Sequence, residues 1–389
     1  MIDEELHAPQ ELIEATRALR PLIEAEAPRI EAARRITPEV VAALQNVGLY
    51  RMLVPKSLGG MELSLNAYSE VMQEVAAADA STAWCLSQNS GICRVSAYLP
   101  HNGALEVFGR PDAVLSWGNG PGTARVVEGG YVLTTRLQTS SGCHHATWLG
   151  CQDAELADEH GNVDPSTRGR RHGAILFFPA SEARIEDVWQ VSGLRGTGSD
   201  TYSVTELFVP ERHRAAATPF EKNPLYLFST TNIFAIGFAS VCLGIARASL
   251  DALEELAGGK TSRGASSTMR EQTRVQGVIG RNEAHLRSVR AYLQDAIAEA
   301  WQQVGRSRRL DMRTRIDLRL ATTYTMQRCA AVVDAAYTTA GSTAVYTSNA
   351  FERRFRDMHA ATQHIQARDD HFENVGKYVL GGEPDTGWL

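Results

Sequence analysis

The chain has 389 residues, of which 43% are hydrophobic and 22% charged, a composition typical of folded globular proteins. At ~150 residues per domain, this length predicts two or three domains. The net charge of -6 argues against a general nucleic-acid-binding role, which would favour a basic face.

Neither a membrane span nor an export signal is expected. The longest apolar run, 233–245, is broken by Gly237, Ser240 and Gly244. It is shorter than the ~20 residues that a membrane span needs, so it predicts a buried helix. The first ten residues are acidic and polar, unlike a secretory signal or a basic transit peptide. We therefore expect a cytoplasmic protein.

The six cysteines form no C-x-x-C pair and no zinc-like spacing, so each is expected to be a reduced, buried thiol. Cys143 is followed by His144 and His145, which are residue types that bind metals. Neighbours in a strand point to opposite faces, so three consecutive residues cannot all aim at one ion. We expect no metal site here.

Residues 1–112 are expected to form an N-terminal helical domain, because apolar side chains recur at helical spacing. Thr37-Pro38 has the residue types of a helix start, and Gly48 those of a helix end. Helices are expected over the ranges 11–32 (kinked or restarted at its prolines), 38–47, 65–78 and 81–98.

Residues 113–215 change character, with short apolar runs separated by turn signals at hairpin spacing. Gly129-Gly130 predicts a hairpin turn, and the polar stretch 154–171 a loop. Strands are expected at 113–117, 124–127, 131–135, 147–151, 174–178 and 202–208. This pattern is typical of a β-barrel or a small sandwich.

Residues 216–389 are helical again and fit an antiparallel four-helix bundle. The four proline-free stretches are 233–257, 269–301, 311–341 and 349–366. The predicted fold class is therefore α+β, with an N-terminal helical domain, a middle β domain and a C-terminal helical bundle.

Two segments of the β domain could contact a flat ligand. In Ser116–Gly122, glycines let the backbone approach closely and Trp117 could cover the ligand, although a packed turn explains the segment as well. Neither a P-loop nor a dinucleotide-binding fingerprint is present. In 139–146, hydroxyl residues precede Gly142 and could hydrogen-bond a cofactor or simply form a polar hairpin.

Two later segments are also candidates. The glycine-dense segment 191–200 predicts a tight loop, shaped for a ligand or merely connecting. In 352–365, a helical wheel puts Arg353, Asp357 and His364 on one stripe with small alanines. Arg353 and Asp357 are most simply an ion pair. His364 could face a cavity or be a satisfied core histidine.

In this order and in a chain of this length, the four segments resemble the acyl-CoA dehydrogenase superfamily. The most distinctive matches are Leu194–Ser199, leading to Phe208–Glu211, and Arg356-Asp357. Val54–Gly60 and Ser81–Trp84 also match. Within the superfamily the chain most resembles the flavin-dependent monooxygenase branch. These are oxygenase components of two-component systems, such as p-hydroxyphenylacetate hydroxylase, dibenzothiophene monooxygenase and indole or indole-acetate oxygenases.

One departure separates the branches. Straight-chain acyl-CoA dehydrogenases carry a catalytic glutamate shortly after the Arg-Asp pair, whereas no carboxylate lies between Asp357 and Asp369 here. Removing the α-proton of a thioester needs a positioned base. His364 falls where the monooxygenase branch places a histidine. A dehydrogenase or related flavin oxidase with a relocated base stays the alternative, and a non-catalytic relative is a third.

The resemblance assigns roles to individual residues. The catalytic pair would be His364, as acid/base, and Ser141, which would hydrogen-bond the flavin near N5. Many relatives have a histidine in the helix at 81–98, where this chain has Asn89 and its neighbours. The cofactor-binding residues would be Trp117, Ser141, Gly142 and Arg263, and the substrate-binding residues Asn89 and Trp84. Arg263 would bind the flavin phosphate, often that of a neighbouring subunit, or be a solvated loop charge.

The resemblance also implies the reaction. A separate NAD(P)H-dependent flavin reductase supplies reduced FMN or FAD. The flavin reacts with O2 at C4a in a dry pocket. The resulting C4a-hydroperoxyflavin then hydroxylates a small aromatic or heteroaromatic substrate of phenol or indole type. The implied assembly is a homotetramer. From the charge, the apolar run and the cysteine spacing we expect no nucleic-acid, membrane or metal partner.

Overall fold

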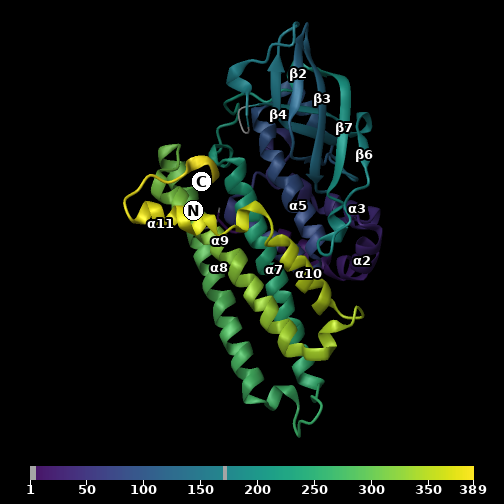
Figure 1. Cartoon of the computed structure of the whole chain (residues 1–389), viewed down its shortest axis with the longest axis vertical. Coiled ribbons are helices and arrows are strands. Elements are labelled where there is room, and N and C mark those ends of the chain that lie inside the picture. The colour runs from purple at the N-terminus through teal and green to yellow at the C-terminus, as the bar shows by residue number, and fades with distance from the viewer. Residues whose placement is uncertain (1–5, 170–172) are drawn as a thin grey trace.

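The computed structural model describes residues 6–169 and 173–389 and runs from helices through a sheet to helices again (Figure 1). The first five residues, and the last two of the expected 154–171 loop, lie outside the described residues. The N-terminal helices are α1 (Gln10–Ala18), α2 (Arg20–Ala33), α3 (Pro38–Val47), α4 (Leu65–Ala78), α5 (Ala80–Cys93) and α6 (His101–Phe108).

The helix expected at 11–32 is divided in two at Leu19. Pro21 lies in the first turn of α2, where its missing N–H costs no hydrogen bond. The bounds expected for α3 are confirmed, and Gly48 closes the helix with a left-handed φ of 81°. The Thr37 hydroxyl makes no capping hydrogen bond, so proline at the first helical position starts this helix.

The middle of the chain forms one mixed, seven-stranded sheet with the order β1-β4-β2-β3-β7-β6, and with β5 paired to β4. The strands are β1 (Leu115–Trp117), β2 (Gly122–Val127), β3 (Gly130–Ser140), β4 (Trp148–Ala157), β5 (Ala174–Pro179), β6 (Arg184–Glu186) and β7 (Asp200–Pro210). The expected hairpin at Gly129-Gly130 joins β2 to β3. The prediction of a loop from Ala154 was wrong at its start, because β4 continues to Ala157 beside β2.

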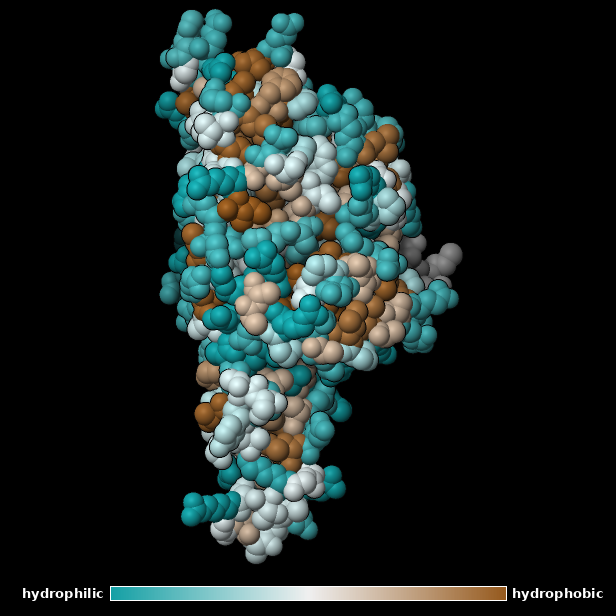
Figure 2. Space-filling view, turned by 90° about the vertical axis from the view of Figure 1, so that its right-hand side faces the viewer, coloured by the Kyte–Doolittle hydropathy of each residue, from teal (hydrophilic) through white to brown (hydrophobic). Residues whose placement is uncertain are grey.

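The C-terminal helices are α7 (Thr230–Gly259), α8 (Thr273–Ser307), α9 (Met312–Ala340), α10 (Ala350–Ala361) and α11 (Asp370–Val379). The bundle tapers away from the sheet, as the side view in Figure 2 shows. The prediction of one helix over 349–366 was wrong at its end, because α10 stops at Ala361. The sequence reasoning did not include α11.

The two helical regions share one hydrophobic core, in which α4 and α5 pack against α7. Tyr68 and Leu86 from the N-terminal region and Phe238 from α7 are fully buried in it. By length and composition α7 could cross a membrane, but 89% of its most apolar window is buried inside the protein. This is the position of a core helix, as the broken apolar run predicted.

Candidate active site

A cavity of about 510 Å³ lies where α5, the sheet and the end of α10 meet. Its size is within the usual range of small-molecule sites, ~300–1,000 Å³. Its lining comes from every region of the chain: Trp84, Gln88, Asn119, Thr139, Ser141, Trp189, Val191, Ser192, Gly193, Leu194, Ser199, Ala360, Gln363 and His364. We call it the first cavity. Helices and sheet together therefore build one site.

A second cavity of about 670 Å³ adjoins the first. The residues that line both cavities are Gln88, Asn119, Gln363 and His364. Trp117 and Phe234 line only the second cavity and meet edge to face, with ring centroids 6.2 Å apart. The segment Thr386–Leu389 also lines it. Two joined compartments of this size could hold a cofactor ring and a substrate side by side.

Ser141 is buried but lines the first cavity, and its contact with a flavin stays a prediction. Its hydroxyl oxygen lies 2.8 Å from that of Ser199, which lies 2.7 Å from that of Thr197. The Thr197 hydroxyl donates to the carbonyl oxygen of Leu194 at 2.8 Å. Ser141 is thus the cavity end of a row of three hydroxyls.

His364 lies at the junction of the two cavities. Its ring meets Trp84 and Phe238 edge to face, at centroid distances of 5.4 and 4.6 Å. Burial, followed by the nearby charge of Arg319, lowers the pKa of His364 from 6.5 to about 4. The ring is therefore neutral at physiological pH.

The tautomer of His364 follows from its position beyond α10. Its Nδ1 accepts a hydrogen bond from the backbone N–H of Gln366 at 3.3 Å, so it carries no proton. In the neutral ring the proton is then on Nε2, which is a donor. The sequence placed His364 on the helical stripe of Ala360 and Ala361. It lies instead in the turn that follows the helix.

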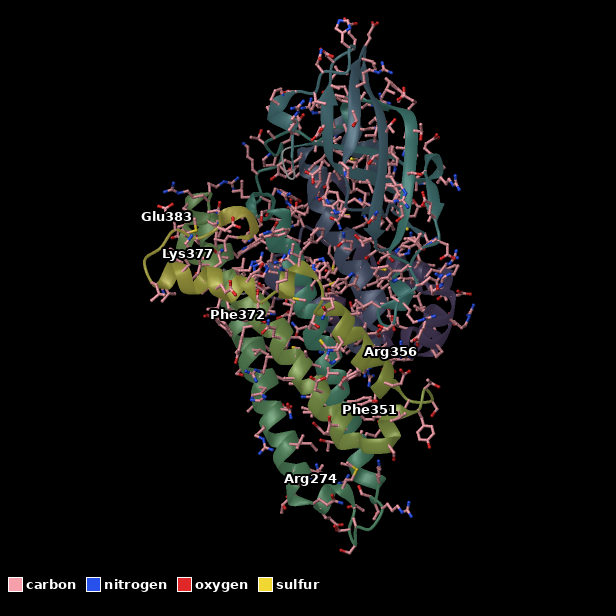
Figure 3. All side chains as sticks on the ribbon, viewed as in Figure 1. Arg274, Phe351, Arg356, Phe372, Lys377 and Glu383 are labelled. Atoms are coloured by element: carbon pink, nitrogen blue, oxygen red, sulfur yellow. The ribbon has the colours of Figure 1, made fainter. Side chains whose placement is uncertain are left out.

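Arg356 and Asp357 of α10 hydrogen-bond the backbone of the glycine-dense loop at 191–200. Asp357 accepts the backbone N–H of Leu194 at 2.6 Å, and Arg356 donates to the carbonyl oxygen of Ser192 at 2.6 Å. Arg356, labelled on α10 in Figure 3, also forms an ion pair with Glu31 of α2, with its Nη2 2.7 Å from Glu31 Oε1. A Cβ on Gly193 would lie 2.0 Å from the Arg356 carbonyl oxygen, so only glycine fits between loop and helix.

The expected ion pair between Arg353 and Asp357 does not form, since no oxygen of Asp357 lies within salt-bridge distance of Arg353. Burial, followed by the nearby charge of Asp79, raises the pKa of Asp357 to about 7, while the charge of Arg353 acts in the opposite direction. Asp357 is thus mainly an acceptor for the Leu194 N–H.

Asn89 is fully buried and lines neither cavity. Its Nδ2 donates to the Leu115 carbonyl oxygen at 2.6 Å, and its Oδ1 lies 3.2 Å from His145 Nε2. The interpretation of Asn89 as a substrate-binding residue is therefore corrected, because its polar atoms are engaged behind the site. The residue of α5 that lines both cavities is its neighbour Gln88.

Gly142 also lies behind the first cavity, where its N–H donates to the Thr197 carbonyl oxygen at 3.0 Å. It has a left-handed φ of 75°, and a Cβ there would lie 2.7 Å from Asn89 Oδ1. Gly142 therefore shapes the turn after Ser141 rather than lining the site.

The structure places the remaining candidates in three different locations. Trp84 lines the first cavity and Trp117 only the second. Arg263 is exposed in the loop joining α7 to α8, at the end of the bundle farthest from the sheet (Figure 1). It therefore cannot reach the cavities of its own chain, and a role at a neighbouring subunit's site stays a prediction.

Sequence reasoning missed several lining residues. Ser199 lies in the glycine-dense segment, and its hydroxyl was a usable signal. Gln88 directly precedes Asn89, and Gln363 directly precedes His364. Whether such a residue or its neighbour lines the cavity depends on side-chain direction and on where the helix ends, and the sequence shows neither. His144 and His145 diverge: His144 Nε2 lies 2.7 Å from Asp200, whereas His145 faces Asn89.

Comparison with known proteins identifies relatives over nearly the whole chain. Residues 10–104 match the family model of the acyl-CoA dehydrogenase N-terminal domain, and residues 236–369 that of an acyl-CoA dehydrogenase C-terminal domain. Indole-3-acetate monooxygenase of Pseudomonas putida is 31% identical over 92% of this chain and 90% of its own. The oxygenase component of the FADH(2)-dependent resorcinol hydroxylase of Rhizobium sp. (strain MTP-10005) is 28% identical over 97% and 98%.

Among solved structures, XiaF from Streptomyces sp. in complex with FADH2 and glycerol superposes with a TM-score of 0.89. It is 24% identical and covers 97% of each chain. This likeness shows that the two chains share one fold.

Proposed function

Because the chain belongs to the acyl-CoA dehydrogenase superfamily and, within it, to the flavin-dependent monooxygenases, we propose that it is the oxygenase component of a two-component system. Its substrate would be a small aromatic or heteroaromatic compound of phenol or indole type. A separate NAD(P)H-dependent reductase would supply reduced FMN or FAD. When bound, the reduced flavin would supply the activation of O2 by the C4a route described above.

The residues of the two cavities fit such a group. The isoalloxazine ring is flat, with donors and acceptors along one edge and an apolar edge opposite. The hydroxyl of Ser141 and the amide of Gln88 offer polar partners, while Trp84 supplies an apolar face. We propose that the flavin ring and the aromatic substrate together fill the two joined cavities.

The position and protonation state of His364 are the observation that supports the proposal most strongly. A neutral imidazole with its proton on Nε2, at the junction of both cavities, can donate a hydrogen bond to an oxygen atom there. The rings of Trp84 and Phe238 pack against it edge to face and give it a largely apolar environment. The resemblance implies an acid/base role for His364. We propose that within this role His364 acts as the hydrogen-bond donor.

The same geometry disfavours the dehydrogenase alternative. That reaction needs a base beside the substrate, and His364 Nδ1 is already engaged by Gln366. Among the described residues that line the cavities, Asp153 in the second supplies the one side-chain carboxylate. The homotetrameric state and the cytoplasmic location remain proposals. The distance of Arg263 from its own site supports the former.

Oxygen labelling tests the proposal. The protein is mixed with a generic flavin reductase, NADH, FMN or FAD and a panel of phenols and indoles under labelled O2. We expect one labelled oxygen atom in the product of at least one aromatic compound. The proposal fails if the protein instead retains oxidised flavin that an acyl-CoA thioester reduces anaerobically, with no labelled product.

A further inference from the structure

The hydroxyls of Ser141, Ser199 and Thr197 are almost completely buried, each with at most 4% of its surface exposed. They make three hydrogen bonds in a row: Ser141 with Ser199, Ser199 with Thr197, and Thr197 with the Leu194 carbonyl oxygen. Each hydroxyl carries a single proton, whereas a carbonyl oxygen can only accept. Three protons are therefore available for three bonds.

This count determines the direction of every bond. The Thr197 hydroxyl must donate to the carbonyl oxygen of Leu194, because that oxygen can only accept. Ser199 must then donate to Thr197, and Ser141 must donate to Ser199. The Ser141 oxygen then presents lone pairs, and no proton, to the first cavity. Ser141 is an acceptor because of a carbonyl group three hydrogen bonds away.

The carbonyl group at the far end is itself held in place. Besides the Thr197 hydroxyl, it accepts the indole N–H of Trp189 at 3.0 Å and the backbone N–H of Thr197 at 3.2 Å. The N–H of the same residue, Leu194, donates to Asp357. Since the carbonyl oxygen keeps two donors when the Thr197 hydroxyl turns away, reversing the row costs about one hydrogen bond.

We propose that Thr197 and Ser199 are positioning residues that make Ser141 select the reduced over the oxidised form of the flavin. This inference rests on the proposed function. The resemblance places Ser141 near N5, which carries a hydrogen in the reduced ring and only a lone pair in the oxidised ring. An acceptor oxygen on Ser141 can take a hydrogen bond from N5 of the reduced ring. Against the oxidised ring, the same oxygen would place its lone pair opposite the lone pair of N5, which is repulsive. A difference of one hydrogen bond corresponds to about tenfold in affinity.

The test is anaerobic titration of the purified protein with FMN and with FAD, each oxidised and dithionite-reduced, to give the ratio of the two dissociation constants. Thr197→Val removes the end of the row, which frees Ser199 to donate to Ser141 and Ser141 to donate into the cavity. We expect the preference for reduced flavin to fall about tenfold, mainly through tighter binding of the oxidised form. Thr197→Ser keeps the hydroxyl and should keep the preference.

Two further variants keep the test decisive. Ser199→Ala breaks the row without touching Thr197 and should lower the same ratio, even if Thr197→Val does not fold. Thr322→Val removes a buried hydroxyl of α9 that donates to the Leu318 carbonyl oxygen and lines neither cavity, and it should leave the ratio unchanged.

The outcomes separate the two proposals. If Thr197→Val and Ser199→Ala weaken both oxidation states equally, the row is merely structural and this inference is overturned. The proposed function then still stands, provided that the wild-type protein oxygenates an aromatic compound with reduced flavin. If the wild-type protein binds neither form and gives no product, both proposals fail.

Discussion

Replacing His364 by alanine removes the Nε2–H donor of a residue that lines both cavities. Loss of one donor aimed at developing charge in a dry site costs about 10²–10³-fold in rate. We expect a loss of about 10²-fold in oxygenated product per reduced flavin consumed, with hydrogen peroxide taking its place. The hydroxyl of Ser141 is untouched, so affinity for reduced flavin should change much less.

The pH profile tests the tautomer assignment separately. The pKa of His364 is lowered to about 4, so the ring stays neutral and its Nε2 stays a donor from about pH 5 to 8. The yield of oxygenated product should show no inflection near the ordinary histidine pKa of 6.5.

The assay is single-turnover oxygenation, with product and peroxide quantified across this pH range. His359→Ala is the matched control, because His359 pairs with Asp334 in the bundle rather than lining either cavity. An inflection near pH 6.5 that disappears in His364→Ala would show that His364 titrates at its ordinary pKa and would contradict the lowered pKa. An undiminished yield in His364→Ala would remove the residue from the mechanism.

Three further predictions concern other parts of the chain. Gly193→Ala drives a Cβ against the Arg356 carbonyl oxygen and should lower the free energy of unfolding by about 1–3 kcal/mol in urea titrations, whereas Gly280→Ala in open space should not. Native Asp357, whose pKa is raised from 3.8 to about 7, holds a proton that the unfolded chain has released, so wild-type stability should fall as pH rises from about 4 to 7. Asp357→Asn should flatten that part of the curve of urea midpoint against pH, and an unchanged curve would contradict the shift. Arg263→Ala should weaken binding of reduced flavin about tenfold in calorimetric titrations, because a charged hydrogen bond is lost. Arg274→Ala is the control. If an oligomeric preparation of Arg263→Ala binds reduced flavin as tightly as the wild-type protein, Arg263 is a solvated loop charge.

Local signals were sufficient to predict most elements of the fold. Helix α3 starts with Pro38 and ends at Gly48, and the β2–β3 hairpin turns at Gly129, because proline and glycine act within a few residues. The extension of β4 to Ala157 was missed because its pairing with β2 is a non-local, parallel contact. The three-residue strand β6 is too short to give any periodicity.

The candidate site was predictable only in part, for the same reason. Ser141 and His364 were found by residue type and order, and both line the first cavity. Asn89 was assigned to the right helix, but its side chain points to His145 and Leu115, behind the cavity. The apolar spacing of α5 did not reveal this, because nearly the whole helix is buried and therefore lacks a polar face.

The peptide of Leu194 connects the parts of the site that the sequence keeps apart. Its N–H is held by Asp357 of α10, the helix that precedes the turn of His364, and its carbonyl oxygen ends the hydroxyl row that begins at Ser141. Leu194 adopts a left-handed φ of 50°, a backbone conformation that is unfavourable for a residue with a Cβ. The surrounding contacts must therefore hold the peptide in this conformation. A change at Asp357 should therefore alter both the stability of the chain and its preference between the two flavin oxidation states. A change at Arg356, which holds the neighbouring Ser192 carbonyl oxygen, should alter stability with less effect on that preference, because no hydrogen bond connects it to the hydroxyl row.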